Sequence, residues 1–107
     1  MSFDYTILRD GDTITVAPEG DISLETIPVL REVLRQVVES HENGRIDVDM
    51  TSVTFLDSSG IGVLVAAKRA AAARGTDLML TEPGPMIRMV LQISNLEEIL
   101  VRQEATS

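Results

Sequence analysis

The sequence contains no cysteine and no tryptophan, and aromatic residues make up only 3% of its 107 positions. Without cysteine the chain has no disulfide framework, thiol nucleophile or thiolate metal site, which fits a reducing compartment. Residues 1–4 show no basic start followed by an apolar stretch, so no signal peptide is expected. The longest uncharged apolar run, 61–67, is far shorter than the roughly 20 residues that span a bilayer. We therefore expect a cytoplasmic protein without direct membrane insertion.

Basic residues are also few, with 9 Lys+Arg against 17 Asp+Glu, which gives a formal net charge of −8. An overall negative charge opposes binding to nucleic acid, so we expect no nucleic-acid partner. The hydrophobic fraction of 44% and the charged fraction of 24% are ordinary for a globular chain. Residues 1–107 are therefore predicted to form one domain that needs no metal or cofactor to fold.

Apolar periodicity and turn residues predict the element order β-β-α-β-α-β-α-β. Strands are expected at 5–9, 13–19, 46–50 and 78–80, and helices at about 27–41, 58–74 and 85–94. The first two strands form a hairpin around Asp10-Gly11-Asp12. Segment 96–101 fits a last strand or a short helix, and the order counts it as a strand. The pattern predicts an α/β domain with one mixed sheet and helices packed against it.

Residues for metal or acid–base chemistry are sparse. His41, the one histidine, lies in a polar stretch at a predicted helix end, where a solvated cap explains it. Asp47 and Asp49 are two apart on one strand and point to the same face, which fits a solvated sheet edge better than a cation site. Gly60 and Gly62 lack the complete spacing of a phosphate-binding loop.

The segment Asp57-Ser58-Ser59-Gly60 stands where a strand leads into the second predicted helix. Asp and Ser are preferred helix caps and Gly allows tight backbone geometry, so a purely structural interpretation is open. A functional interpretation is open as well, because a hydroxyl at a helix start lies where the dipole and free N–H groups favour an anion. A phosphate added there could leave the fold intact.

A family resemblance favours the functional interpretation. Phe55-Leu56-Asp57-Ser58-Ser59-Gly60-Ile61-Gly62-Val63-Leu64 resembles the signature of bacterial anti-sigma-factor antagonists, the STAS domain family. Matching segments occur in the family's order at Gly20-Asp21-Ile22, at 46–50, and at 85–91 ahead of Asn95-Leu96. The resemblance covers nearly the whole chain.

The resemblance implies a partner-switching role. In the family, a partner that is both serine kinase and anti-sigma factor phosphorylates the serine directly after the aspartate, which is Ser58 here. The unmodified antagonist binds this kinase and releases the sigma factor; the phosphorylated form does not bind, and a serine phosphatase restores it. The chain would be a substrate and not an enzyme.

We expect the partner to contact the turn Asp57-Ser58-Ser59-Gly60, which we call the acceptor turn, as well as the small-residue face of the following helix and the loop before the first helix. Ser23 in that loop stands where many family members carry an acidic residue. The expected partner-binding residues are Asp57, Ser58, Ser59, Gly60, Gly62, Val63, Ala66, Asp21 and Ser23.

Two other functions are weighed against this one. The first is a STAS scaffold subunit of a membrane lipid-transport complex, which would not need serine phosphorylation. The second is a small hydrolase with Ser58 as nucleophile, which lacks a nearby base. Many family members also carry a further C-terminal helix, and its absence before Ser107 would leave a sheet edge or the first helix open for a homodimer.

Overall fold

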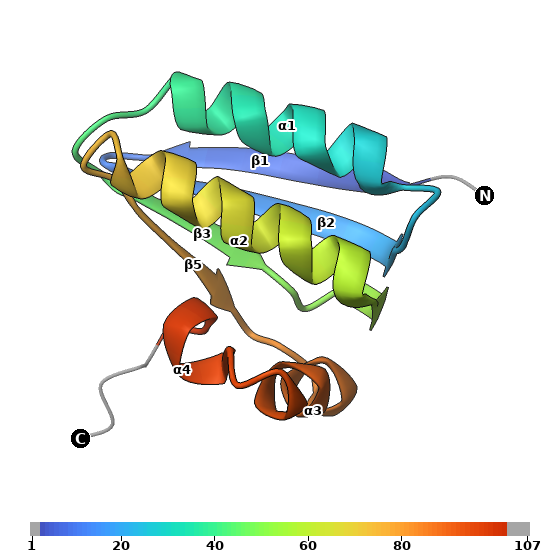
Figure 1. Ribbon diagram of the computed structural model, residues 1–107. Helices are drawn as coiled ribbons and strands as arrows, with labels where there is room; N and C mark the ends of the chain where they lie inside the picture. Colours follow the sequence, from blue (N-terminus) through green and yellow to red (C-terminus); the bar gives the residue numbers. More distant parts are fainter. Residues whose placement is uncertain (1–2, 103–107) are drawn as a thin grey trace.

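The computed structural model describes residues 3–102, and its elements alternate between strands and helices after an opening hairpin (Figure 1). In chain order they are β1 (Asp4–Asp10), β2 (Thr13–Ile22), α1 (Ile27–Glu39), β3 (Arg45–Asp49), β4 (Val53–Leu56), α2 (Ser58–Ala72), β5 (Asp77–Thr81), α3 (Pro85–Ile93) and α4 (Glu97–Leu100). The predicted α/β domain with a mixed sheet is confirmed.

The sheet has the strand order β1-β2-β3-β5, with β4 paired to β2. β1 is antiparallel to β2, whereas the β2–β3, β3–β5 and β2–β4 pairs are parallel. β2 changes partner along its length: its first half lies beside β3, and from Gly20 onward it lies beside β4. The register shifts between Gly20 and Asp21, and Gly20 has a φ of +103°, a conformation that glycine adopts at little cost.

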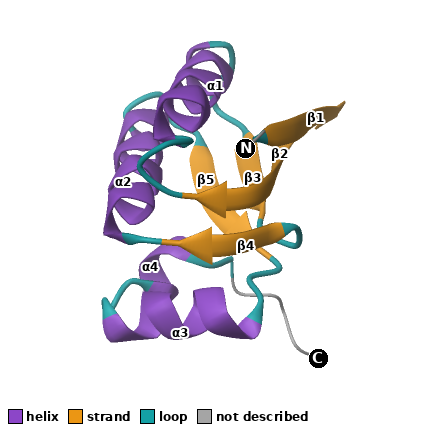
Figure 2. Cartoon of the chain, turned by 90° about the vertical axis from the view of Figure 1, so that its right-hand side faces the viewer, coloured by secondary structure: helices purple, strands orange, loops and turns teal. Residues whose placement is uncertain are grey.

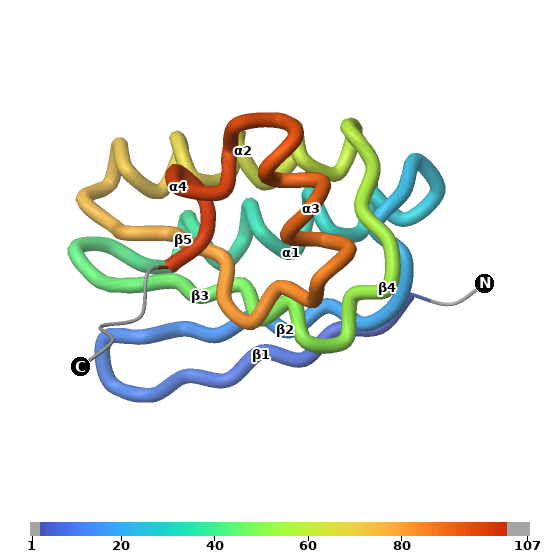
Figure 3. The backbone as a smooth tube through the Cα atoms, turned by 90° about the horizontal axis from the view of Figure 1, so that it is seen from below, coloured from blue at the N-terminus to red at the C-terminus, as the bar shows by residue number. Residues whose placement is uncertain are grey.

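The helices form two groups around the core. α1 and α2 lie side by side on one face of the sheet, while α3 and α4 lie at the end near β4 and β5 (Figure 2). Seen from below, α3 lies toward β4 and α4 toward β5 (Figure 3). Alternate residues of β5 and of the first part of β2 are buried and meet the apolar stripes of the helices. The fully buried side chains include Ile14, Val16, Leu30, Leu34, Ile46, Leu64, Leu80 and Leu91.

The structure corrects the predicted element order in two places. β4 was not predicted from the sequence, because its four residues show no apolar alternation. In the structure only Val53 and Leu56, at the two ends of the strand, are buried. The predicted last strand is instead the short helix α4, after which Val101 makes an isolated parallel bridge to Leu80. Two glutamates in the first turn of α4 favour the helix, since they oppose its positive N-terminal dipole.

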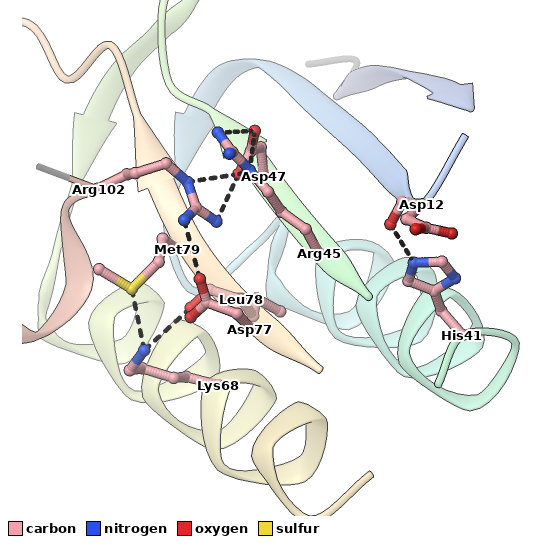
Figure 4. A network of polar contacts seen from close by, with 9 residues as sticks. All are labelled: Asp12, His41, Arg45, Asp47, Lys68, Asp77, Leu78, Met79 and Arg102. Atoms are coloured by element: carbon pink, nitrogen blue, oxygen red, sulfur yellow. Dashed lines mark hydrogen bonds and ion pairs between the residues drawn. The ribbon is translucent and has the colours of Figure 1, made fainter. Parts of the chain in front are cut away.

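Asp47 is also placed differently from the prediction. β3 lies between β2 and β5, so Asp47 is only 8% exposed and not part of a solvated edge. Arg102 reaches it from the other end of the sequence, with Nε 2.8 Å and Nη2 2.7 Å from Oδ1 (Figure 4). The Nη2 contact is an ion pair without hydrogen-bond alignment. The hydrogen bond that Arg45 donates to Asp47 raises the pKa of Arg45. Arg102 also contacts Asp77, so two arginines face two carboxylates.

The same figure shows His41 fixed to the hairpin. Its Nε2 atom lies 2.7 Å from the main-chain oxygen of Asp12, so the ring joins the end of α1 to the β1–β2 turn and is not a freely solvated cap (Figure 4). Within residues 3–102, no three His, Asp or Glu side chains are grouped closely enough to hold a metal ion.

Candidate functional site

The acceptor turn begins with a capped helix end. Asp57 occupies the N-cap of α2 in an extended conformation, and its Oδ1 accepts a hydrogen bond of 3.0 Å from the backbone N–H of Gly60. The main-chain oxygen of Asp57 accepts another bond from Ile61 N–H. This cap satisfies one of the free N–H groups of the first turn and fixes the direction in which the helix leaves the strand.

The residues that follow the Asp57 cap differ in exposure. Ser58 and Ser59 are exposed, and neither hydroxyl makes a hydrogen bond to another of the residues 3–102. Gly60 is buried: a Cβ atom there would lie 2.6 Å from Ile22 Cγ2 and 2.7 Å from a Leu56 methyl carbon. The Ser58 hydroxyl is therefore accessible to an enzyme, whereas Gly60 permits the close approach that holds the turn against β2 and β4.

The loop between β2 and α1 lies beside this turn. Asp57 N–H points to the main-chain oxygen of Ile22 at 3.4 Å, and Asp21 pairs with Phe55 in the short β2–β4 ladder. The Asp21 carboxylate accepts a hydrogen bond from the Thr54 hydroxyl at 2.5 Å. The structure thus brings the predicted residue Asp21 to the acceptor end of the sheet.

Ser23 lies within a hydrogen-bonded turn of the same loop. Its N–H donates to Thr26 Oγ1 at 3.0 Å, and that hydroxyl donates to the main-chain oxygen of Asp21 at 2.7 Å. Thr26 occupies the N-cap position of α1. Its side chain forms hydrogen bonds within the loop and does not cap a backbone N–H group of the helix. Ser23 is half-buried, so the loop presents it in a fixed position.

A groove runs between α1 and α2 from the acceptor turn. One hollow, with a volume of about 340 Å³, is lined by Ser59, Gly62 and Leu24 among others. It adjoins a second hollow of about 220 Å³ that continues to Ala70. Arg31, Val63 and Ala66 line both hollows. Gly62 and Ala66 are exposed as predicted, but Val63 is only 7% exposed and forms part of the groove floor, not of an outer face.

Three residues at this end were not singled out by the sequence. Leu24 is 74% exposed and Phe55 is 42% exposed, both next to predicted site residues. Neither a motif nor the family resemblance predicts that Arg31 lines the groove, because only the packing of α1 on α2 brings it there. The two methionines of α3 were not singled out either: Met86 and Met89 are 50% and 53% exposed.

Comparison with known proteins identifies the family. The chain matches the family described as "Mlab, STAS domain" over residues 6–102. The chain belongs to the STAS domain family. Among curated STAS relatives, the "Anti-sigma-B factor antagonist" of Listeria monocytogenes is 30% identical over 86% of this chain and 80% of its own length. The protein of the same name from Bacillus subtilis is 27% identical over 94% of this chain and 90% of its own.

Solved structures show the same STAS fold. An anti-sigma factor antagonist from Mycobacterium paratuberculosis superposes with a TM-score of 0.83 at 21% identity, covering 95% of this chain and 87% of that one. The unphosphorylated anti-sigma factor antagonist SpoIIAA gives 0.76 at 20% identity, covering 95% and 90%. The predicted resemblance is confirmed. In the part of the STAS chain that the structure describes, every helix is too short or too polar to cross a membrane.

Proposed function

We propose that this STAS domain is an anti-sigma-factor antagonist in the bacterial cytoplasm, switched by phosphorylation of Ser58. The unmodified form binds an anti-sigma factor that is also a serine kinase, and this binding releases the sigma factor. The observation that carries the proposal is the exposed Ser58 hydroxyl, which makes no hydrogen bond within residues 3–102 and is presented by the Asp57 cap in a chain 30% identical to a curated anti-sigma-B factor antagonist.

The chemical step makes the chain a substrate. The kinase transfers the γ-phosphoryl group of ATP to Ser58 Oγ; the Oγ–P bond forms, the bond to the ADP oxygen breaks, and the hydroxyl proton leaves to the kinase or to water. A serine phosphatase hydrolyses the ester and restores the hydroxyl. The roles of Asp57, Ser59 and the Asp21–Ser23 loop are partner contact and orientation, supported by their position around Ser58.

Phosphorylation acts on binding and not on the fold. The phosphate adds about −1.5 to −2 charges at an exposed position of the first turn of α2, where free N–H groups and the helix dipole accept it. An acidic partner group about 4 Å away would be repelled by roughly 4 kcal/mol per unit charge at an effective dielectric of 20. Since about 1.4 kcal/mol corresponds to a tenfold change in affinity, a hundredfold or greater loss is expected.

The test is to incubate the purified chain with ATP and each anti-sigma kinase encoded in the same genome, and to map phosphorylated residues by mass spectrometry. One phosphate on Ser58, and none in the Ser58→Ala variant, is expected from one of these kinases. Complete absence of phosphate with every kinase would refute the switch and favour the scaffold role in a membrane lipid-transport complex. Sedimentation of the chain alone tests the proposed homodimer.

A further inference from the structure

The groove between α1 and α2 has the form of a helix-binding site. Its α2 wall consists of Gly62, Ala66 and Ala70, which are spaced four residues apart, share one face and are all exposed. The eight steps from Gly62 to Ala70 span about 12 Å, because a helix rises 1.5 Å per residue. This length matches two turns of a partner helix, enough for apolar anchors at positions i, i+4 and i+7.

The floor of the groove is apolar as well. Leu34 and Val38 of α1 and Val63 of α2 form the surface between the helices. The short side chains on α2 leave room that the longer residues of α1 do not fill, and Leu24 extends the apolar surface at the acceptor end. An occupant therefore needs an apolar face.

The charged side chains at the rim of the groove restrict which helix can bind there. Arg35 lies between Glu32 and Glu39, with its Nη1 2.9 Å from the Glu39 carboxylate, so it already has two carboxylate partners and the three side chains together carry a charge of −1. Arg31 lines both hollows of the groove, and among residues 3–102 it forms no ion pair with a carboxylate. Of the two arginines that line the groove, Arg31 is thus the one without a carboxylate partner in the described part of the chain. A carboxylate on the occupant complements it.

From these observations we infer that the α1–α2 groove binds an amphipathic helix of the anti-sigma factor that carries an Asp or Glu facing Arg31, flanked by apolar residues one turn away on each side. The inference rests on the proposed function, which supplies the partner. It adds the shape and the charge of the partner segment. The groove begins at Ser59, so a helix seated in it ends next to the Ser58 hydroxyl.

Two pairs of variants test this inference by calorimetric titration with the kinase that phosphorylates Ser58, using ADP in place of ATP so that no transfer occurs. Arg31→Glu is compared with Arg69→Glu, since both arginines are exposed and lack an ion pair within residues 3–102, but Arg69 lies outside the groove. Ala66→Gln, which fills the groove, is compared with Ala72→Gln, which changes an exposed alanine of the same helix outside it. Thermal melting verifies that each variant is folded.

We expect Arg31→Glu and Ala66→Gln to weaken binding at least about tenfold, with the two controls within about threefold of the unmodified chain. Replacing one partner carboxylate by Lys should restore binding to Arg31→Glu. If Ser58→Glu abolishes binding while both groove variants bind normally, the inference is wrong and the proposed function stands. If the unmodified chain binds none of the kinases, the proposed function fails and the inference falls with it.

Discussion

Asp57 Oδ1 and the backbone nitrogen of Gly60 are 3.0 Å apart, and this one hydrogen bond sets the course of the chain from β4 into α2. The bond holds the two serines between them on the outside of the turn. Ser58 is consequently presented by an element that does not depend on the serine itself.

Asp57→Ala should destabilise the domain by about 1 kcal/mol, the usual cost of losing an N-cap side chain. Asp57→Asn should restore most of that stability, because its amide oxygen can accept the same bond from Gly60 N–H. Urea denaturation at neutral pH measures both changes. Equal loss in the two variants would show that the charge of Asp57, and not its capping oxygen, stabilises the turn.

Ser58→Ala and Ser58→Glu should both retain the stability of the domain within about 1 kcal/mol, since the side chain is exposed and a negative charge is favourable at a helix start. They should differ in binding: Ser58→Ala should bind the kinase constitutively, and Ser58→Glu should bind poorly. Titration with the kinase and ADP gives the two affinities. Equal affinities would contradict the phosphorylation switch.

The two glycines of the site should respond oppositely to alanine. Gly60→Ala should cost about 1–3 kcal/mol, because its new methyl group would overlap Ile22 and Leu56. Gly62→Ala should gain about 0.5–1 kcal/mol, because no atom lies within 4 Å of the added methyl and alanine favours the helix. Thermal unfolding of the two variants against the parent checks both signs.

Arg102→Met should destabilise the domain by about 1–3 kcal/mol, because it removes two contacts to the buried Asp47 carboxylate and leaves Arg45 as its remaining cation. Arg88→Met is the matched control. Its partner Glu97 and Arg88 itself are more exposed, so the cost should stay below about 1 kcal/mol. Chemical denaturation distinguishes the two, and equal costs would mean that the Asp47 pair behaves as a surface pair.

The Glu32–Arg35 pair on α1 should give a small pH dependence. A hydrogen bond from Arg35 holds the pKa of Glu32 below its ordinary value. Because the folded state lowers this pKa, the stabilisation is present above the ordinary carboxyl range and is lost as the pH falls through the lower, folded value. The difference in urea midpoint between the parent and Glu32→Gln should thus shrink from about pH 7 to about pH 3. A difference in urea midpoint that grows on acidification would contradict a lowered pKa of Glu32 in the folded state.

The acceptor turn was predictable because its causes are local. Asp57, two serines and Gly60 specify a capped helix start in four successive residues, and the apolar repeats of α1 and α2 lie on either side of it in the chain. The resemblance then singled out Ser58 among the hydroxyls.

Features that depend on distant segments were not predictable. Asp47 has the same local pattern as an edge residue, and only Arg102, 55 positions later, shows that it is buried and paired. β4 is too short and too exposed to stand out from a loop until β2 supplies its pairing partner. Arg31 belongs to the groove only through the packing of two helices.

The change of partner along β2 divides the parallel pairing of this strand into two ladders. One joins Thr13–Val16 to β3, and the other consists of Gly20, Asp21 and Ile22 beside β4. The second ladder is short and carries the loop before α1 as well as the turn before α2. Local opening at this end should therefore release both loops together as one cooperative unit, while the amides of β3 and β5 stay protected from hydrogen exchange. Local motion of the turn that carries Ser58 should then depend on three residue pairs and not on the whole domain.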